Sequence, residues 1–379
     1  MKLLFHLAST AVFGGSVRVL YNKVRWLVDR GGYEIVIVTT DQHGGQPYFD
    51  FPASVKMIDL GINYWDDYSK NPLARTWLTL RKQRMHRRKL AEVLRQERPD
   101  ITFVHYPTEA WVAADIRDGS PKVMEFHTSR YFRLQETPQG LHRLVARYRS
   151  RQDRQRAKRF STVVVLTEED REQWGLPGLR VIPNAAPQVN VAADPGRSRT
   201  VIAVGRLIPL KRFDQLLEAW AMLPAELRSC WQLKIFGDGH LEEPLKQQAL
   251  SLGIGDSVQI LPSTGDIYTE YANAALLTMT SQYEGLSMVM LEALSVGLPM
   301  VSYSFKCGPR DLIDDGENGY IVPLGDVKAL SAAMQKLMRD DALRDRMSRA
   351  ARRKAEAFQE ARIMEKWEAL FHELTDRKI

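Results

Sequence analysis

Two cations follow one predicted strand at a spacing that suits a diphosphate. Arg206 comes directly after the strand expected at Thr200–Gly205, and Lys211 lies five positions further on, where a helix is about to begin. At the carboxyl end of a strand, an arginine fork and a lysine point charge can converge on one diphosphate. There they would stabilise the negative charge that builds up on a departing nucleoside diphosphate. The alternative is that both residues are solvated surface charges. The residues around the pair decide between the two interpretations.

That context is a second segment, Ser281–Met288, which leads into a helix expected to run through Val296. Gly285 and Ser287, on either side of Leu286, are small enough to let the backbone approach a ligand. The free N–H groups and the positive dipole end of the helix that follows favour a phosphate. The segment therefore predicts a phosphate site made by the main chain.

Two carboxylates flank this helix start. Glu284 stands just before the helix, and Glu292 lies on its second turn. A sugar diphosphate anchored at the helix start would place Glu292 near the ribose hydroxyls of the nucleotide and Glu284 near the transferred sugar, and carboxylates accept hydroxyl hydrogen bonds well. A charge that complements the helix dipole and an ordinary helical glutamate remain the alternative.

The first half of the chain offers weaker candidates. Gly14 and Gly15 follow the first predicted strand and precede an amphipathic helix at Val17–Asp29, which is a place where backbone can approach a ligand. His127 ends the strand expected at Lys122–His127, where an imidazole can donate to a phosphate or a sugar hydroxyl. A plain turn and a structural histidine are the alternatives. Further positions that are also consistent with turns are Gly237–Gly239, Asn184 and Lys306–Gly308.

Short apolar runs alternate with longer amphipathic stretches along the chain, which is typical of parallel sheets covered by helices. The strands expected run from Lys2–Ala8 to Arg180–Pro183 in the first half and from Thr200–Gly205 to Tyr320–Val322 in the second. We therefore expect two doubly wound, Rossmann-like α/β domains facing each other across a cleft. The Ala-, Pro- and Gly-rich stretch 185–199 reads as the linker. The predicted domains are residues 1–188 and 189–358, and a last helix in 359–379 is expected to pack back on the first domain.

Composition limits the class of protein. The 379 residues suit two domains, and the hydrophobic content of 44% is that of an ordinary globular chain. Two cysteines cannot make a disulfide framework or a cysteine-based metal site, which favours a reducing compartment. The short apolar start does not suit a signal peptide, and no apolar run is long enough for a membrane span. The net charge of +7 favours an anionic partner.

Taken together, these residues resemble the GT4 family of retaining glycosyltransferases, which have the GT-B fold. The resemblance covers nearly the whole chain and is strongest over residues 180–330. The matching pieces are Gly14-Gly15, His127, Pro183-Asn184, Gly205-Arg206-Leu207 with Lys211 and Asp214, Gly237-Asp238-Gly239, Glu284-Gly285 with Glu292, Gly297-Leu298-Pro299 and Asp314–Gly319. One departure is the stretch Ser304–Pro309, where many relatives have a shorter link and where Lys306 is placed to add a phosphate contact.

The resemblance implies roles for these residues. Arg206 and Lys211 would bind the donor diphosphate, with Gly14, Gly15, Gly237 and Gly285–Ser287 beside it. Glu292 would bind the ribose, and Glu284 and His127 would contact the transferred sugar. Retention would come from a same-face attack assisted by the leaving phosphate, without a protein nucleophile. The family is metal-independent and uses no other cofactor. The nucleotide sugar is a substrate; a UDP-sugar is favoured, and GDP-mannose remains the alternative because the residues that read the base are not identified in the sequence.

Two basic segments in the first half suggest where an acceptor would be met. The first carries Trp77, Leu78 and Leu80 among its cations, and basic amphipathic helices of this kind suit an anionic membrane surface. We expect a cytoplasmic protein that docks peripherally on the membrane and receives a glycan or a lipid-linked saccharide. Nucleic acid is not expected, because the segments lack interleaved stacking aromatics. The cations are Arg75, Arg81, Lys82, Arg84, Arg87, Arg88 and Lys89 in one segment and Arg143, Arg147, Arg149, Arg151, Arg154, Arg156, Lys158 and Arg159 in the other.

Two other functions remain open at this point. One is a UDP-sugar epimerase on the same fold, which would need no acceptor. The other is a non-catalytic protein that keeps the nucleotide site and serves in an assembly. The intact set of Arg206, Lys211, Glu284 and Glu292 argues against the second, because a protein without catalysis would have little need for all four.

Overall fold

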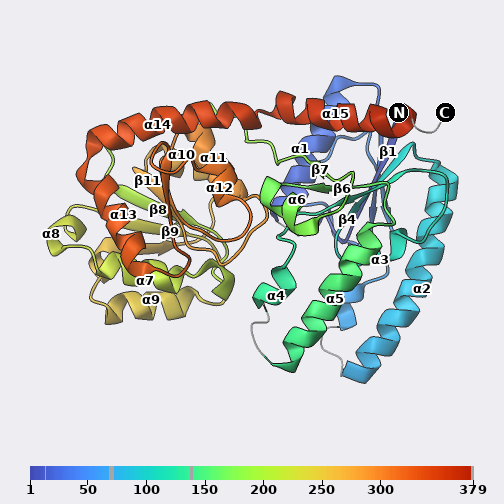
Figure 1. Ribbon diagram of the computed structural model, residues 1–379, viewed down its shortest axis with the longest axis horizontal. Helices are drawn as coiled ribbons and strands as arrows, with labels where there is room; N and C mark the ends of the chain where they lie inside the picture. Colours follow the sequence, from blue (N-terminus) through green and yellow to red (C-terminus); the bar gives the residue numbers. More distant parts are fainter. Residues whose placement is uncertain (13, 68–71, 137–139, 377–379) are drawn as a thin grey trace. The chain divides into compact units, whose positions relative to one another are not determined.

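The computed structural model describes residues 1–12, 14–67, 72–136 and 140–376 of the chain. These residues form two compact units (Figure 1). Unit 1 consists of Met1–Leu166, Asp170–Ile182 and Met364–Ile379, and unit 2 of Thr167–Glu169 and Pro183–Ile363. Each unit is built on one sheet whose pairings are all parallel, with helices packed against it.

The strand order of the sheet in unit 1 is β3-β2-β1-β4-β5-β6-β7. Its strands are β1 (Lys2–Leu7), β2 (Glu34–Thr39), β3 (Lys56–Asp59), β4 (Ile101–His105), β5 (Lys122–Glu125), β6 (Thr162–Val165) and β7 (Arg180–Val181). Its helices are α1 (Gly15–Arg30), η1 (Tyr64–Asp67), α2 (Pro72–Glu97), α3 (Thr108–Ala113), α4 (Phe132–Glu136) and α5 (Leu141–Ala157), while α6 (Glu168–Trp174) begins in unit 2 and ends in unit 1.

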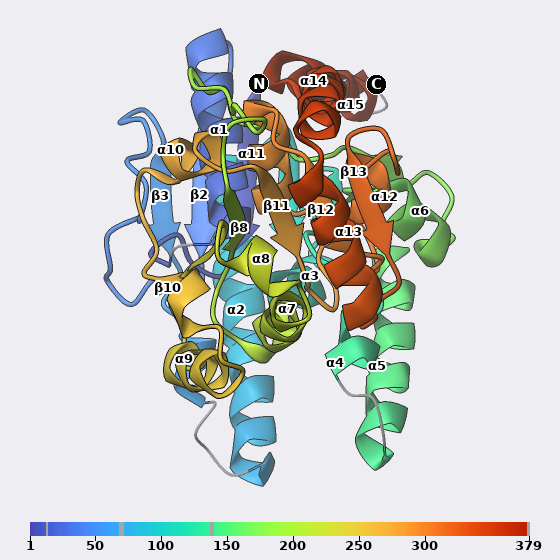
Figure 2. The same cartoon turned by 90° about the vertical axis from the view of Figure 1, so that its left-hand side faces the viewer.

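The strand order of the sheet in unit 2 is β10-β9-β8-β11-β12-β13, and Figure 2 shows β8, β11, β12 and β13 in this order. Its strands are β8 (Thr200–Val204), β9 (Gln232–Phe236), β10 (Val258–Leu261), β11 (Leu276–Met279), β12 (Met300–Tyr303) and β13 (Gly319–Val322). Its helices are η2 (Pro209–Lys211), α7 (Phe213–Ala221), α8 (Ala225–Arg228), α9 (Glu242–Ser251), η3 (Gly255–Ser257), α10 (Ile267–Ala272), α11 (Met288–Val296), α12 (Pro309–Leu312), α13 (Val327–Arg339), α14 (Asp341–Ala355) and η4 (Glu356–Phe358).

Both sheets reverse direction beside their first strand. The reversal lies between β1 and β4 in unit 1 and between β8 and β11 in unit 2. At such a point the loops that leave the two neighbouring strands part to opposite faces of the sheet, and ligands of open α/β sheets bind in the crevice between them. The topology therefore selects the loops after β8 and β11 as the ligand site of unit 2.

The stretch expected to be a linker packs as part of unit 2. The N–H of Ala186 donates to the carbonyl of Phe358, and the N–H of Ala193 donates to that of Val296. The buried guanidinium of Arg344 donates through Nε to the carbonyl of Pro195 at 2.7 Å. Because these bonds fasten the stretch to unit 2, the division falls between Ile182 and Pro183 and not at the predicted residue 188.

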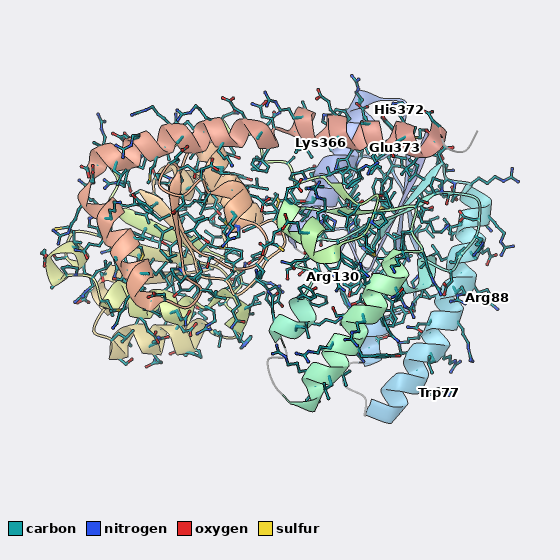
Figure 3. The ribbon with its side chains drawn as sticks, viewed as in Figure 1. Trp77, Arg88, Arg130, Lys366, His372 and Glu373 are labelled. Carbon is teal, nitrogen blue, oxygen red and sulfur yellow. The ribbon has the colours of Figure 1, made fainter. Side chains whose placement is uncertain are left out.

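The last helix, α15 (Glu360–Asp376), belongs to unit 1 from Met364 onward, whereas the sequence placed the start of this segment at residue 359. Phe371 is fully buried, and its ring lies 5.4 Å from that of Phe103 on β4. At the sheet edge, Glu373 accepts a hydrogen bond of 2.7 Å from Arg180 on β7. Glu373 is labelled on α15 in Figure 3.

We predict that Phe371→Ala destabilises unit 1 by about 3–5 kcal/mol, because the change leaves a cavity where an aromatic ring was packed. Denaturant unfolding followed by circular dichroism measures the effect. His372→Ala, at the exposed neighbouring position, should leave the transition within about 0.5 kcal/mol of the wild type. Equal transitions for the two variants would show that α15 does not contribute to the core.

Candidate active site

The loops after β8 and β11 meet through one ion pair. Lys211 Nζ lies 2.6 Å from Glu284 Oε1, and the two side chains are only 11% and 18% exposed. Ser281 Oγ donates to the same carboxylate oxygen at 2.8 Å. Thr280 Oγ1 donates to the carbonyl of Lys211 at 2.7 Å, so a side chain of one loop also bonds to the backbone of the other. Two residues that the sequence assigned to a diphosphate and to a sugar are therefore neighbours at the switch point of the sheet.

Arg206 lies in the same loop as Lys211 but differs from it in its surroundings. Its side chain is exposed and makes no ion pair with any residue that the structure describes. An unpaired guanidinium in the same loop as a mostly buried ammonium leaves this loop with an excess of positive charge. The arrangement suits an anionic group that is free to enter from solvent.

Gly237 is fixed by backbone packing. A Cβ placed on it would lie 1.9 Å from the carbonyl oxygen of Gly205, and its φ of +155° is rarely adopted by other residues. This contact holds the loop after β9 against the loop that carries Arg206. The sequence expected Gly237 at the donor site, and the structure gives it a packing role beside that loop.

The start of α11 is held by contacts from outside the helix. Ser287 occupies the N-cap position without a capping hydrogen bond from its side chain. Asn184 Nδ2 donates to the carbonyl of Leu286 at 3.2 Å, and Gly308 packs so closely that a Cβ there would lie 3.0 Å from the carbonyl oxygen of Gly285. Because the side chain of Ser287 makes no capping bond, the first N–H groups of the helix keep their donor capacity for an anion.

Glu292 is placed on the buried side of α11. It is 5% exposed, and Tyr271 donates its hydroxyl hydrogen to Glu292 Oε2 at 3.0 Å. This buried tyrosine was not singled out in the sequence, because it lies 21 positions away on α10 and carries no local motif. Tyr271 fixes the orientation of the carboxylate that the resemblance assigns to the ribose.

Lys306 does not have the position expected for it. Its Nζ lies 3.0 Å from Glu169 Oε1, and its side chain is 62% exposed. The N–H of Cys307 donates to the other oxygen of Glu169 at 3.0 Å. The loop after β12 is therefore tied to the start of α6 within unit 2, and the ammonium of Lys306 is paired with Glu169.

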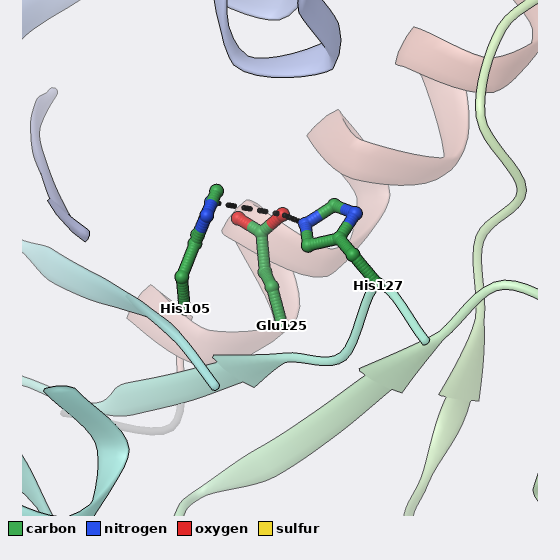
Figure 4. A group of neighbouring side chains, drawn as sticks. All are labelled: His105, Glu125 and His127. Atoms are coloured by element: carbon green, nitrogen blue, oxygen red, sulfur yellow. Dashed lines mark hydrogen bonds and ion pairs between the residues drawn. The ribbon is translucent and has the colours of Figure 1, made fainter. Parts of the chain in front are cut away.

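His127 belongs to a buried charged cluster in unit 1, two residues beyond the end of β5. Its Nε2 lies 3.2 Å from Glu125 Oε2 (Figure 4). The ammonium of Lys23 on α1 lies 2.8 Å from the same oxygen. His105, at the end of β4, has its Nε2 4.0 Å away from this oxygen. Gly14 and Gly15 begin the helix that brings Lys23 here, and a Cβ on Gly14 would meet open space.

The charges of this cluster follow from its burial. Burial opposes ionisation of Glu125, but Lys23 and the hydrogen bond from His127 outweigh it, so the pKa of Glu125 lies well below its usual value. Burial, together with His127, lowers the pKa of His105 to about 3, so this imidazole is neutral at physiological pH. The carboxylate is therefore ionised and its principal counter-charge is Lys23.

The same cluster contains atoms that a metal ion accepts. His105, Glu125 and His127 offer ligand atoms within 4.8 Å of one another, a set that Zn²⁺ can bind. Sequence reading missed the group, although a Glu and a His two positions apart at a strand end are a visible signal. The ammonium of Lys23 already supplies a positive charge 2.8 Å from the shared oxygen. Any cation entering there would meet the repulsion of that ammonium.

We predict that Gly237→Ala disrupts the loop that carries Arg206, because its Cβ would collide with the Gly205 carbonyl oxygen. Over-packing of this kind typically costs about 1–3 kcal/mol, and thermal unfolding should show the loss. The control is Gly265→Ala, where a Cβ meets nothing within 4 Å, and it should unfold like the wild type. A stable Gly237→Ala protein with an unshifted loop would contradict the packing role.

Comparison with known proteins now adds the family. A family model described as a glycosyl transferase 4-like domain matches residues 14–185, and one described as glycosyl transferases group 1 matches residues 188–354. Together they cover most of the chain, one model on each unit. The resemblance inferred from the motifs is thereby confirmed.

Similar bacterial proteins are also named as transferases. An exopolysaccharide phosphotransferase of Streptomyces coelicolor is 35% identical over 231 residues, which are 59% of this chain and 24% of that protein. A Campylobacter jejuni N-acetyl-D-galactosaminyltransferase, named for a saccharide on PP-undecaprenol, is 24% identical over 99% of both chains. The chain spans 24% to 60% of the length of the Streptomyces protein and of two other bacterial relatives.

The fold has a close counterpart among solved structures. A Staphylococcus aureus TarM mutant, in complex with fondaparinux, alpha-GlcNAc-glycerol and UDP, superposes with a TM-score of 0.77 at 15% identity, covering 98% of this chain and 99% of that one. At this identity the likeness establishes the fold. Given the two family models and this architecture, the chain belongs to the GT4 family of glycosyltransferases and has the GT-B fold.

Proposed function

We propose that this glycosyltransferase moves a hexose or an N-acetylhexosamine from a UDP-sugar to a glycan or lipid-linked saccharide, with retention of anomeric configuration. The observation that supports the proposal most directly is the meeting of Lys211 and Glu284 at the switch point of unit 2. The TarM structure that shares the fold contains UDP. The Campylobacter relative is named for an acceptor on a polyprenyl diphosphate.

The leaving group would be stabilised by the charges of the loop after β8. As the bond to the sugar breaks, charge develops on the diphosphate, and Lys211 and Arg206 supply fixed positive charge there. The uncapped N–H groups at the start of α11 add donors that point along the helix axis. The acceptor hydroxyl would attack from the face that the diphosphate leaves, and its proton would pass to a phosphate oxygen. This scheme needs no protein nucleophile.

Glu284 and Glu292 would have different tasks. Glu284 is tied to Lys211 and is partly exposed, so a sugar hydroxyl can reach its carboxylate. Glu292 is buried and oriented by Tyr271, which suits the fixed recognition of ribose hydroxyls. Removing Glu292 should then weaken donor binding more than it slows the transfer step.

Catalysis without a metal ion is part of the proposal. The charge that a metal would supply to the diphosphate is available from Lys211 and Arg206. In unit 1, Lys23 supplies the counter-charge of Glu125. We therefore interpret the cluster of His105, Glu125 and His127 as an ion-pair network.

The two other functions are less well supported. The relatives reported above are named as transferases and none of them as an epimerase, so the epimerase finds no support there. A non-catalytic nucleotide-binding protein would keep UDP binding without turnover. The Lys211–Glu284 contact favours catalysis, because binding of a nucleotide alone does not require a carboxylate next to the diphosphate lysine.

An anionic membrane surface is proposed as a partner of unit 1. Both α2 and α5 extend beyond the sheet in the same direction (Figures 1 and 2). Large apolar side chains are exposed on them, with Trp77 at 61% on α2 and Tyr148 at 62% on α5. None of the described helices is long and apolar enough to cross a membrane. Peripheral contact through these two helices, on the cytoplasmic side, is the form that we propose.

The structure reduces the number of cations available for this contact. Lys82 and Lys89 donate to the carbonyls of Asn63 and Leu60, and Arg154 donates to that of Trp174. The side chain of Arg75 lies outside the described residues. Exposed cations that make no ion pair with a described residue remain on both helices: Arg81, Arg84 and Arg88 on α2 and Arg147, Arg149 and Arg151 on α5.

We predict that Lys211→Ala and Arg206→Ala each lower kcat about 100- to 1,000-fold, as for loss of a fixed transition-state donor. Transfer from radiolabelled UDP-sugars to a bacterial lipid-saccharide extract measures it. Glu292→Ala is the comparison, in which donor KM should rise more than kcat falls. Turnover near the wild-type level in both cation variants would refute the diphosphate assignment.

We predict that UDP raises the melting temperature of the protein in the presence of a chelator, whereas ADP and GDP raise it less. A ligand that binds only the folded state stabilises the protein, and the stabilisation grows with the logarithm of the ligand concentration relative to Kd. The measurement is a thermal shift assay, with the Lys211→Ala variant as control. A shift that disappears on chelation would show that a metal takes part, and no shift with any nucleotide would undercut the transferase proposal.

We predict that the protein floats with anionic liposomes at low salt and is released at high salt, since each cation near the lipid surface contributes about 1 kcal/mol. Arg84→Glu/Arg88→Glu should abolish flotation. The matched control is Arg349→Glu/Arg353→Glu, with the same charge change at exposed positions on α14 of unit 2. Absence of binding at low salt would remove the membrane from the proposal.

A further inference from the structure

The two ring nitrogens of His127 have different surroundings. Nε2 lies 3.2 Å from Glu125 Oε2, whereas Nδ1 is buried and has no hydrogen-bond partner among the described residues. Figure 4 shows Nδ1 on the side of the ring away from Glu125. A buried polar atom without a partner carries a desolvation cost, which a bound ligand can relieve.

Glu125 determines which nitrogen carries the hydrogen. Its Oε2 is paired with the buried ammonium of Lys23 at 2.8 Å, and the two side chains are only 4% and 2% exposed. An ionised carboxylate has no hydrogen to donate. In the contact with His127 the ring must therefore be the donor, so Nε2 bears the hydrogen. In the neutral imidazole, Nδ1 is then left with a lone pair.

We propose that Glu125 is a positioning residue that holds His127 as the Nε2–H tautomer, so that the Nδ1 lone pair accepts a hydrogen bond from a hydroxyl of the sugar substrate. The proposal rests on the function proposed above and on the role that the family resemblance implies for His127, which is contact with the transferred sugar. It changes the chemistry of that contact. The sequence suggested that His127 donates to a phosphate or a hydroxyl, whereas the Nε2–H tautomer uses its hydrogen on Glu125.

Lys23 is the second part of this arrangement. It reaches the carboxylate from α1, and its ammonium also lies 3.5 Å from the ring centroid of Trp367 on α15. Contact with an aromatic face partly compensates a buried ammonium for lost hydration. His105 faces the same oxygen at 4.0 Å and is neutral, so it does not displace the lysine. The orientation of His127 thus depends on groups from α1, β4 and β5.

The tautomer can be observed directly in the free protein. We expect the ¹⁵N spectrum of histidine-labelled protein, in mildly alkaline buffer, to show a protonated Nε2 and an unprotonated Nδ1 for His127, with His127→Asn providing the assignment. In Glu125→Gln the amide can donate or accept, so a population with hydrogen on Nδ1 should appear. A wild-type Nδ1–H tautomer, or an unchanged spectrum in Glu125→Gln, would overturn the positioning role.

Two further variants separate an effect on the tautomer of His127 from a general loss of stability. Glu125→Gln leaves the ammonium of Lys23 buried without its partner, which destabilises the fold. Lys23→Met/Glu125→Gln removes both charges and should give the same change at His127. Glu97→Gln is the control, because Glu97 is another carboxylate of unit 1, 8% exposed, that is paired with Lys2 and Lys56. It should leave the His127 signals and the transfer rate as in the wild type.

Kinetics test the substrate contact separately. We expect His127→Ala and Glu125→Gln each to lower kcat/KM about tenfold to a hundredfold, the usual result of losing or misdirecting a buried hydrogen bond. The combined variant Glu125→Gln/His127→Ala should be no slower than His127→Ala, since both changes remove the same contact. Additive losses would assign Glu125 a role independent of His127. Full activity of His127→Ala would overturn the sugar contact, even where the spectrum supports the tautomer.

Discussion

The ion pair between Lys211 and Glu284 is the contact on which the site in unit 2 depends. It joins two loops that leave neighbouring strands at the point where the sheet reverses direction. A pair with so little exposure is weakly screened, but it pays a desolvation cost that only good geometry repays. Ser281 improves that geometry with a second hydrogen bond to the same oxygen. The lysine is thereby held ready for an anion and does not have to be ordered when one binds.

The backbone around this pair is held by close packing. Gly237 and Gly308 allow two neighbouring loops to approach the chain at Gly205 and Gly285. A Cβ on Gly237 would collide with the Gly205 carbonyl oxygen at 1.9 Å, and a Cβ on Gly308 would be tightly packed at 3.0 Å from that of Gly285. Such contacts leave a loop little freedom, so the cations and N–H groups it carries keep fixed directions. Fixed dipoles and charges stabilise a transition state without the cost of reorganisation. Under the proposed function, the glycines would contribute to catalysis in this indirect way.

Unit 1 also contains a buried charge, the carboxylate of Glu125, that needs partners in the interior. Glu125 has Lys23 as its counter-charge, and His127 and His105 surround the same oxygen. Once such a network is buried, removing one member leaves another uncompensated, which is why its geometry is well defined. Trp367 on α15 contacts the ammonium of Lys23, so the last helix of the chain supports the cluster that orients His127.

The sequence by itself determined the elements and the candidate residues. Hydrophobic period and turn residues are local properties, so the strands appeared within a residue or two of their expected places, and Glu284 and Glu292 were placed correctly about the start of α11. Only the tertiary structure decided which charged side chains pair with each other. Lys23 and Glu125 are 102 positions apart and Lys211 and Glu284 are 73 apart. Lys306 pairs with Glu169, and the stretch after Pro183 packs on unit 2. Pairing of charges depends on which helix face meets which strand end, and on how much water is excluded there, and neither is written in any short stretch of sequence.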